Sequence, residues 1–175
     1  MKKILLLIAI IVITNAAWIY FYSNASNKPS TESSNSAIQI FDLNGTGEMW
    51  DMENYKIIVT PSQVVRGYGK IVYKDDPKNL ENSTYYKFEF KEVSPSGSYD
   101  SVYSNEALSK GGPLSILDNL NEIGSISNEN SYDELKKDKQ NYESTILIVT
   151  WNDNEGELHS ETVQLEITDE IALNQ

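Results

Sequence analysis

Hydrophobic and polar residues alternate in short runs along most of the chain after residue 37, and turn-forming residues separate the runs. The clearest run is 85–93 (YYKFEFKEV), in which aromatic residues alternate with Lys and Glu. Period-two alternation predicts a β-strand that buries one face. Similar runs recur at intervals of roughly ten residues, a spacing typical of β-sandwiches. They are 48–50, 55–60, 64–74, 98–103, 145–151 and 158–167.

Two of these runs predict more detail. The run 145–151 (TILIVTW) is apolar on both faces, as expected of a strand between two packed layers. Residues 152–156 (NDNEG) follow it directly and predict a β-hairpin. Within another run, Gly67 and Gly69 predict a bulge or a close approach of the backbone.

Helical signals are few. Ser131 and Glu134 fit a capping box, which predicts a short exposed helix from Tyr132 to about Lys139. The stretch 114–126 fits either a short helix or a strand. The predicted fold is therefore all-β with minor α content: an antiparallel, immunoglobulin-like β-sandwich with one short helix. The chain has no cysteine, so the disulfide of true immunoglobulin domains is absent.

An uncharged hydrophobic segment precedes the β-rich part. Residues 4–22 are just long enough to cross a bilayer as a helix, and Lys2 and Lys3 before them place the N-terminus in the cytoplasm by the positive-inside rule. We therefore expect a single-pass membrane protein with an extracellular domain. The expected parts are a cytoplasmic N-terminus (1–3), a transmembrane signal anchor (4–22), a flexible Ser/Asn-rich linker (23–40) and a β-sandwich domain (41–175).

Two alternatives stay open at this end of the chain. The segment 4–22 also fits a cleaved signal peptide, because small residues lie in and after it; the domain would then be secreted. The aromatic cluster at 18–22 favours a retained anchor, since such residues prefer the membrane interface. The run 37–43 (AIQIFDL) fits either a first strand or a continuation of the tether.

Charge narrows the choice of partners. The chain carries 14 Lys and Arg against 26 Asp and Glu, a formal net charge of −12. Such a surface repels phosphates, and it lacks the basic stripe that nucleic-acid binding requires. We therefore predict no nucleic-acid partner. The absence of cysteine also excludes thiolate chemistry and Cys-ligated zinc.

Four short motifs carry a family resemblance: 45–50 (GTGEMW), 54–57 (NYKI), 66–69 (RGYG) and 150–151 (TW) ahead of an acidic hairpin. Together they resemble uncharacterised small membrane-anchored envelope proteins and lipoproteins of low-GC Gram-positive bacteria. The resemblance implies one β-sandwich domain tethered outside the membrane, and it transfers no active site. This chain departs from the lipoproteins in lacking a lipidated cysteine, so the hydrophobic segment is its candidate anchor.

The sequence offers no catalytic constellation. Its one histidine, His159, follows the predicted hairpin, where a structural or surface role outweighs a catalytic one. The acidic residues lie mostly in predicted turns, where they favour solvation and local hydrogen bonds. Oxygen-rich loops at 42–45 and 152–157 fit calcium, but neither has the EF-hand pattern. We therefore predict no catalytic residue, no cofactor and no metal site.

We expect a non-enzymatic module that binds another envelope protein. The alternatives are a module that binds cell-wall glycan through exposed tyrosines and, less favoured, a calcium-binding sandwich. We expect Trp50 and Trp151 in the core. Arg66, the only arginine, fits a bidentate carboxylate partner, and an internal salt bridge is its favoured use. The candidate binding residues are Arg66, Tyr68, Tyr85, Tyr99 and Tyr103.

Overall fold

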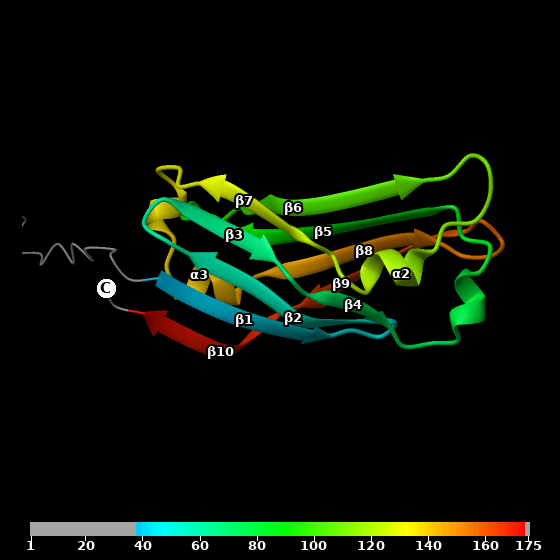
Figure 1. Cartoon of the computed structure of the whole chain (residues 1–175), viewed down its shortest axis with the longest axis horizontal. Coiled ribbons are helices and arrows are strands. Elements are labelled where there is room, and N and C mark those ends of the chain that lie inside the picture. The colour runs from blue at the N-terminus through cyan, green and yellow to red at the C-terminus, as the bar shows by residue number, and fades with distance from the viewer. Residues whose placement is uncertain (1–37, 174–175) are drawn as a thin grey trace, which may run out of the picture. The chain divides into compact units, whose positions relative to one another are not determined.

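Residues 38–173 are the part of the chain that the computed structural model describes, and they form two antiparallel β-sheets packed face to face (Figure 1). This arrangement confirms the predicted two-layered, mostly β fold. The six-stranded sheet has the order β10-β1-β2-β3-β7, and β4 also pairs with β2. Its strands are β1 (Ile38–Thr46), β2 (Trp50–Val59), β3 (Gln63–Gly67), β4 (Lys70–Tyr73), β7 (Ser125–Glu129) and β10 (Glu166–Leu173).

The four-stranded sheet has the order β6-β5-β8-β9. Buried and half-buried residues alternate along all of β5, as its sequence predicts. For β8, the prediction that both faces lie against packed layers is only half right. Leu147 and Val149 face the other sheet and are buried, whereas Ile146 and Ile148 lie on the outer face and are half-buried. The strands are β5 (Tyr85–Val93), β6 (Tyr99–Leu108), β8 (Ile146–Asn152) and β9 (Leu158–Gln164).

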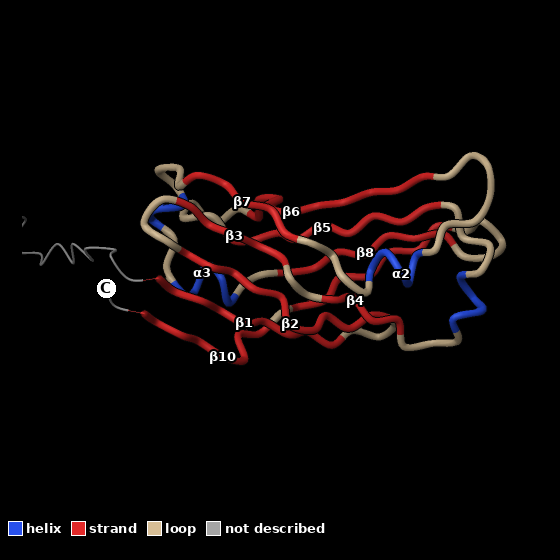
Figure 2. Tube along the Cα trace, in the orientation of Figure 1, coloured by secondary structure: helices blue, strands red, loops and turns tan. Residues whose placement is uncertain are grey.

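Short helices fill the connections at both ends of the sandwich (Figure 2). The single helix predicted at 132–139 is instead a 3-10 turn and a separate α-helix. The Ser131 hydroxyl accepts the predicted bond from the Glu134 amide at 3.2 Å, but the backbone becomes extended at Lys137 and Asp138 caps a new helix. The helical elements are η1 (Pro77–Leu80), α2 (Ile116–Leu120), η2 (Glu134–Lys136) and α3 (Lys139–Glu143).

The core lies between the two sheets and is rich in aromatic rings. Tyr55 of β2 stacks on Phe90 of β5 with ring centroids 4.0 Å apart, and Trp50 meets Trp151 edge-on at 5.4 Å. Both tryptophans are buried, which confirms their predicted place in the core. These contacts join the sheets, and each buried aromatic side chain contributes about 2–3 kcal/mol of transfer free energy.

A glycine-rich segment separates β3 from β4, and both of these strands pair with β2. Gly67 has a φ of +129°, and a Cβ there would lie 2.1 Å from the carbonyl oxygen of Gly124. A Cβ on Gly69 would lie 2.2 Å from the Met52 side chain. Tyr68, between them, is left-handed with a φ of 61°. Of the two predicted possibilities, the close approach of the backbone is therefore confirmed. The structure shows no bulge here, because β3 and β4 pair with β2 in one unbroken register on either side of Tyr68.

The remaining expectations concern boundaries. A strand begins at Ile38, so the run at the domain boundary is a first strand and the sandwich starts before residue 41. The ambiguous stretch 114–126 contains α2 and the beginning of β7. The predicted anchor at 4–22, the N-terminus before it and most of the linker lie outside the described residues. Within residues 38–173, no helix has the length and apolar character needed to span a membrane.

Candidate functional site: a cleft beside the β8–β9 hairpin

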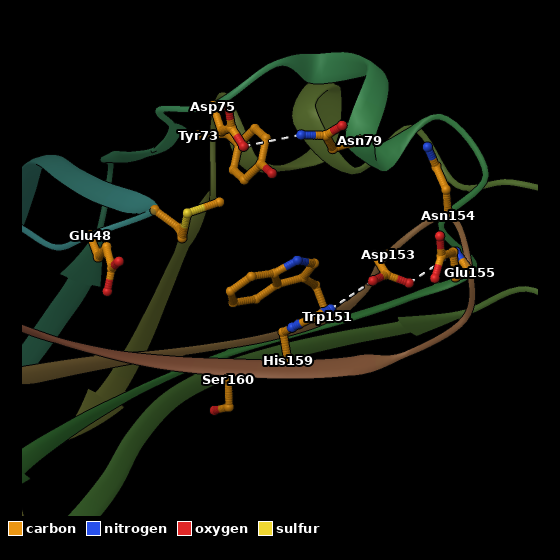
Figure 3. Close-up of a pocket in the computed structure, with 11 residues that line it drawn as sticks. Glu48, Tyr73, Asp75, Asn79, Trp151, Asp153, Asn154, Glu155, His159 and Ser160 are labelled. Atoms are coloured by element: carbon orange, nitrogen blue, oxygen red, sulfur yellow. Dashed lines mark hydrogen bonds and ion pairs between the residues drawn. The ribbon is translucent and has the colours of Figure 1, made fainter.

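A cleft of about 500 Å³ opens at one end of the sandwich. Three segments that are distant in the sequence form its walls: the turn between β1 and β2, the loop from β4 into η1, and the β8–β9 hairpin. Figure 3 shows Tyr73 on one side of the opening and Trp151 on the other. Behind these two rings, Trp50 packs against both, at centroid distances of 4.7 Å to Tyr73 and 5.4 Å to Trp151. The cleft therefore has an aromatic floor that belongs to the core.

Two asparagines tie the hairpin to the opposite wall. The Asn152 side-chain carbonyl accepts from the amides of Thr84 and Tyr85 at 2.9 and 2.8 Å. Asn154 accepts from the Asn82 amide at 2.7 Å and donates to the Lys78 carbonyl at 2.6 Å. Because these bonds join loops some 70 residues apart, they fix the width of the cleft.

The hairpin turn fixes Asp153 and His159. One oxygen of Asp153 accepts from the amides of Glu155 and Glu157, each at 2.9 Å, and the other lies 2.8 Å from Nε2 of His159. The imidazole stacks on Trp151 at a centroid distance of 5.4 Å. The hydrogen bond from His159 holds the pKa of Asp153 below its ordinary value.

Three side chains at this turn, Asp153, Glu157 and His159, form what we call the hairpin cluster. Each offers one potential ligand atom, and these atoms all lie within 4.8 Å of one another. From the sequence, the two acids are expected to be turn residues and His159 to have a structural or surface role. The missed signal was the turn itself, since a tight hairpin returns the chain so that residues six apart lie side by side.

The cleft is strongly anionic. Its charged lining residues are Glu48, Asp75, Asp153 and Glu155, together with His159. Among the described residues, no Lys or Arg forms an ion pair with any of these four carboxylates. Low-dielectric walls concentrate such a field, so the cleft attracts cations and repels anions.

A serine neighbour of the histidine does not extend the pair into a triad. Ser160 also borders the cleft, but its side chain points away from His159 (Figure 3). Its hydroxyl lies 3.3 Å from that of Thr150 on the neighbouring strand. A serine nucleophile needs its base within hydrogen-bond reach, and this arrangement does not provide one.

A second surface feature lies on the outer face of the six-stranded sheet. Ile171, Ile40, Ile58 and Val65 lie directly opposite one another on the four adjacent strands β10, β1, β2 and β3. We call these four residues the aliphatic row. The three on the inner strands are half-buried and Ile171 is 42% exposed, so they form a continuous apolar strip that faces outward.

The aliphatic row is flanked on one side by a further apolar pair and on the other by a row of charged residues. Ile38 and Leu173 are also register partners and extend the apolar strip at one edge. On the other flank, Asp169, Asp42 and Lys56 share a row across β10, β1 and β2, and Lys56 forms an ion pair with Asp42.

Arg66 lies inside the sandwich, at the end opposite the cleft. Its guanidinium binds the Glu92 carboxylate in a bidentate manner at 2.6 and 2.7 Å and reaches Glu134 at 2.6 Å. Lys137 joins the same carboxylates at 2.6 and 3.3 Å. We call these four residues the inner ion network. The favoured internal salt bridge of Arg66 is therefore present, and its side chain is only 1% exposed.

The four candidate tyrosines do not gather at one place. Tyr68 is exposed in the glycine-rich segment, and Tyr99 is exposed at the start of β6. Tyr85 begins β5 and is half-buried. Tyr103 is half-buried too, and its hydroxyl donates to the Ile123 carbonyl. None of the four lines the cleft, which instead contains Tyr73.

Comparison with protein-family models, with curated proteins and with solved structures found no match.

Proposed function

We propose that this chain is a non-enzymatic, extracytoplasmic binding module that contacts another envelope protein through the outer face of its six-stranded sheet. The aliphatic row is the observation that carries this proposal. A contiguous apolar strip on the outside of a sandwich is unfavourable in water and is typical of a protein interface. Residues 4–22 hold the module at the membrane, and its immunoglobulin-like layers display this face.

The outer face of the other sheet makes the contrast clear. There, Ile148 at the centre of β8 lies opposite Glu89 on one side and Thr162 on the other. Isolated aliphatic residues of this kind are ordinary on protein surfaces. Ile58, in the equivalent central position of the six-stranded sheet, lies between Ile40 and Val65.

Charge indicates the chemistry of the partner. The chain is acidic overall, and the charged row beside the aliphatic row holds two acids, Asp42 and Asp169, against one base, Lys56. A second copy of the chain brings the same negative charge to the interface and is repelled. We therefore assign an apolar protein surface rimmed by Lys and Arg, for which association is steered by charge and weakened by salt.

A photoreactive amino acid placed at Ile58 of the full chain in cell membranes tests this assignment, with the same probe at Ile148 as the matched control. We expect one protein adduct from position 58 and none from position 148. The purified partner should then bind the full chain in micelles with an affinity that falls as ionic strength rises, and Ile58→Lys should abolish binding without loss of fold.

Three outcomes would overturn the proposal. An adduct at twice the chain mass of 19.8 kDa would identify a second copy as the occupant. A lipid adduct would assign the strip to the bilayer surface. Equal labelling from both positions, or none, would show that the outer face of the six-stranded sheet has no specific partner.

The membrane attachment is tested separately. We expect the intact chain to fractionate with membranes and the sandwich to be digested by protease added to spheroplasts. Release of a shortened chain into the medium would instead assign residues 4–22 as a cleaved signal peptide and the sandwich as secreted.

A second candidate function is glycan binding in the cleft. Tyr73 and Trp151 flank an opening lined by carboxylates and the Asn79 amide, a combination that suits sugar rings and their hydroxyls. Titration with tri-N-acetylglucosamine should change tryptophan fluorescence, and Tyr73→Ala should weaken the response while Tyr99→Ala leaves it intact. An unchanged spectrum would remove this candidate.

A further inference from the structure

We propose that the hairpin cluster of Asp153, Glu157 and His159 binds one divalent transition-metal ion, with Zn²⁺ as its simplest representative, at the edge of the cleft. This site is independent of the partner surface on the six-stranded sheet. It rests on the chemistry of the three donors, on the rigidity of two of them and on the unbalanced charge of the cleft beside it.

The donor set selects a class of metal. Imidazole nitrogen together with carboxylate oxygen is a ligand combination for Zn²⁺ and its first-row neighbours. Calcium and magnesium prefer oxygen alone. His159 therefore changes the assignment from the calcium loop considered for residues 152–157 to a transition-metal site.

Two donors are held in place before any metal binds. The second oxygen of Asp153 is bonded to the turn amides of Glu155 and Glu157, which directs the first toward His159. Stacking on Trp151 holds the imidazole plane. Hydrogen bonds and packing contacts around the ligands orient them and raise the affinity for the metal.

Only a small movement is needed to admit the ion. The Asp153 oxygen and His159 Nε2 are 2.8 Å apart, whereas two donors at about 2.0–2.1 Å from a tetrahedral zinc lie about 3.4 Å apart. Rotation of either side chain supplies the difference. Glu157 is exposed, and its carboxylate is free of protein ion pairs among the described residues, so it can close on the metal.

The cleft supplies an independent reason for a cation. Glu48, Asp75 and Glu155 line it without a basic partner among the described residues, in addition to the cluster itself. Their combined field raises the local concentration of a dication. With three protein ligands, one coordination position stays open for water or for a ligand that enters the cleft.

Isothermal titration of the full chain in detergent micelles with ZnCl₂ tests the site, with CaCl₂ as the comparison ion. We expect one Zn²⁺ per chain with a Kd on the order of 1–10 µM, weaker than four-ligand structural sites, and no measurable Ca²⁺ binding. His159→Gln and Glu157→Gln should each weaken Zn²⁺ binding by about tenfold or more. Asp118→Asn, which changes an exposed acid on α2, should leave the affinity unchanged.

The Glu157 variant guards against a trivial loss of structure. The hairpin uses the backbone amide of Glu157 and not its side chain, so Glu157→Gln should keep the circular dichroism and tryptophan fluorescence of the parent. Zinc binding weaker than millimolar would overturn the proposal. Zinc affinity that survives both His159→Gln and Glu157→Gln would do the same, because the ion would then be bound elsewhere.

Discussion

The two ends of the sandwich each hold a cluster of charged side chains, and the clusters differ in burial and in charge balance. In the inner ion network, two cations meet two carboxylates and every side chain makes at least two short contacts. Glu92 is fully buried there. In the hairpin cluster, two carboxylates meet one histidine, and all three side chains retain exposure to solvent.

This difference shows how a charged cluster that stabilises the fold can be distinguished from one that binds a ligand. Burying a charge costs several kcal/mol unless partners neutralise it, so a buried cluster survives only when it is balanced and fully bonded. An exposed cluster carries no such requirement, and a surplus of one sign at a cleft attracts a ligand of the other. Arg66 therefore acts as a structural residue, whereas His159 acts at a binding edge.

The largest expected effect comes from unbalancing the buried end. Arg66→Met leaves Glu92 with Lys137 as its one cationic partner in the network, and it should lower the free energy of unfolding by about 3–5 kcal/mol. Urea unfolding of the full chain in micelles, followed by tryptophan fluorescence, measures the loss. Because the cost is that of an uncompensated charge, Arg66→Met with Glu92→Leu should recover part of the stability. A double variant no more stable than the single one would contradict this explanation.

Removing the second cation should cost less. Lys137→Met abolishes the contacts of 2.6 Å to Glu92 and 3.3 Å to Glu134, but Arg66 still binds both carboxylates. We expect a loss of about 1–3 kcal/mol in the same urea experiment. Lys139→Met is the matched control, since Lys139 forms its ion pairs at the exposed surface. Equal losses from the two lysines would mean that burial of the network adds nothing.

The inner ion network should also make the stability of the fold sensitive to acid. Burial alone would raise the pKa of Glu92, but Arg66 and then Lys137 outweigh it and hold that pKa below its ordinary value. A depressed folded-state pKa gives stability that is present above the ordinary value and is lost as pH falls through the folded one. Stability should therefore change little through Glu92 between about pH 5 and 8 and drop below about pH 4. Glu92→Gln should show a shallower acid slope in urea midpoints, and an identical slope would refute the assignment.

The sequence predicts what one strand or one turn determines alone. Alternation in 85–93 gives the correct inward face of β5, and Gly67 and Gly69 correctly predict a close approach of the backbone. The helix predicted at 132–139 stops after one 3-10 turn, although its capping bond forms, and Glu134 and Lys137 bond to residues of other elements. Local sequence patterns contain no information about such partners.

The aliphatic row could not be predicted from the sequence for a similar reason. Ile40, Ile58 and Ile171 each lie in a different strand, and only the register of the assembled sheet brings them into line. A slip of one residue in any strand would turn its side chain to the core. Asp153 and His159 come closer to prediction, since the hairpin is evident from residues 152–156, but their contact depends on the turn geometry.

The smallest effect on folding should come from the open end. His159→Ala removes the bond to Asp153 and the stacking on Trp151, but the imidazole is 41% exposed and neither contact seals the core. We expect the free energy of unfolding without metal to change by less than about 1 kcal/mol. With saturating ZnCl₂, the parent should gain stability by mass action and the variant should not. Paired urea curves with and without zinc measure both quantities. A loss without metal as large as that of Arg66→Met would show that the hairpin cluster supports the fold, and it would remove the distinction between the two ends.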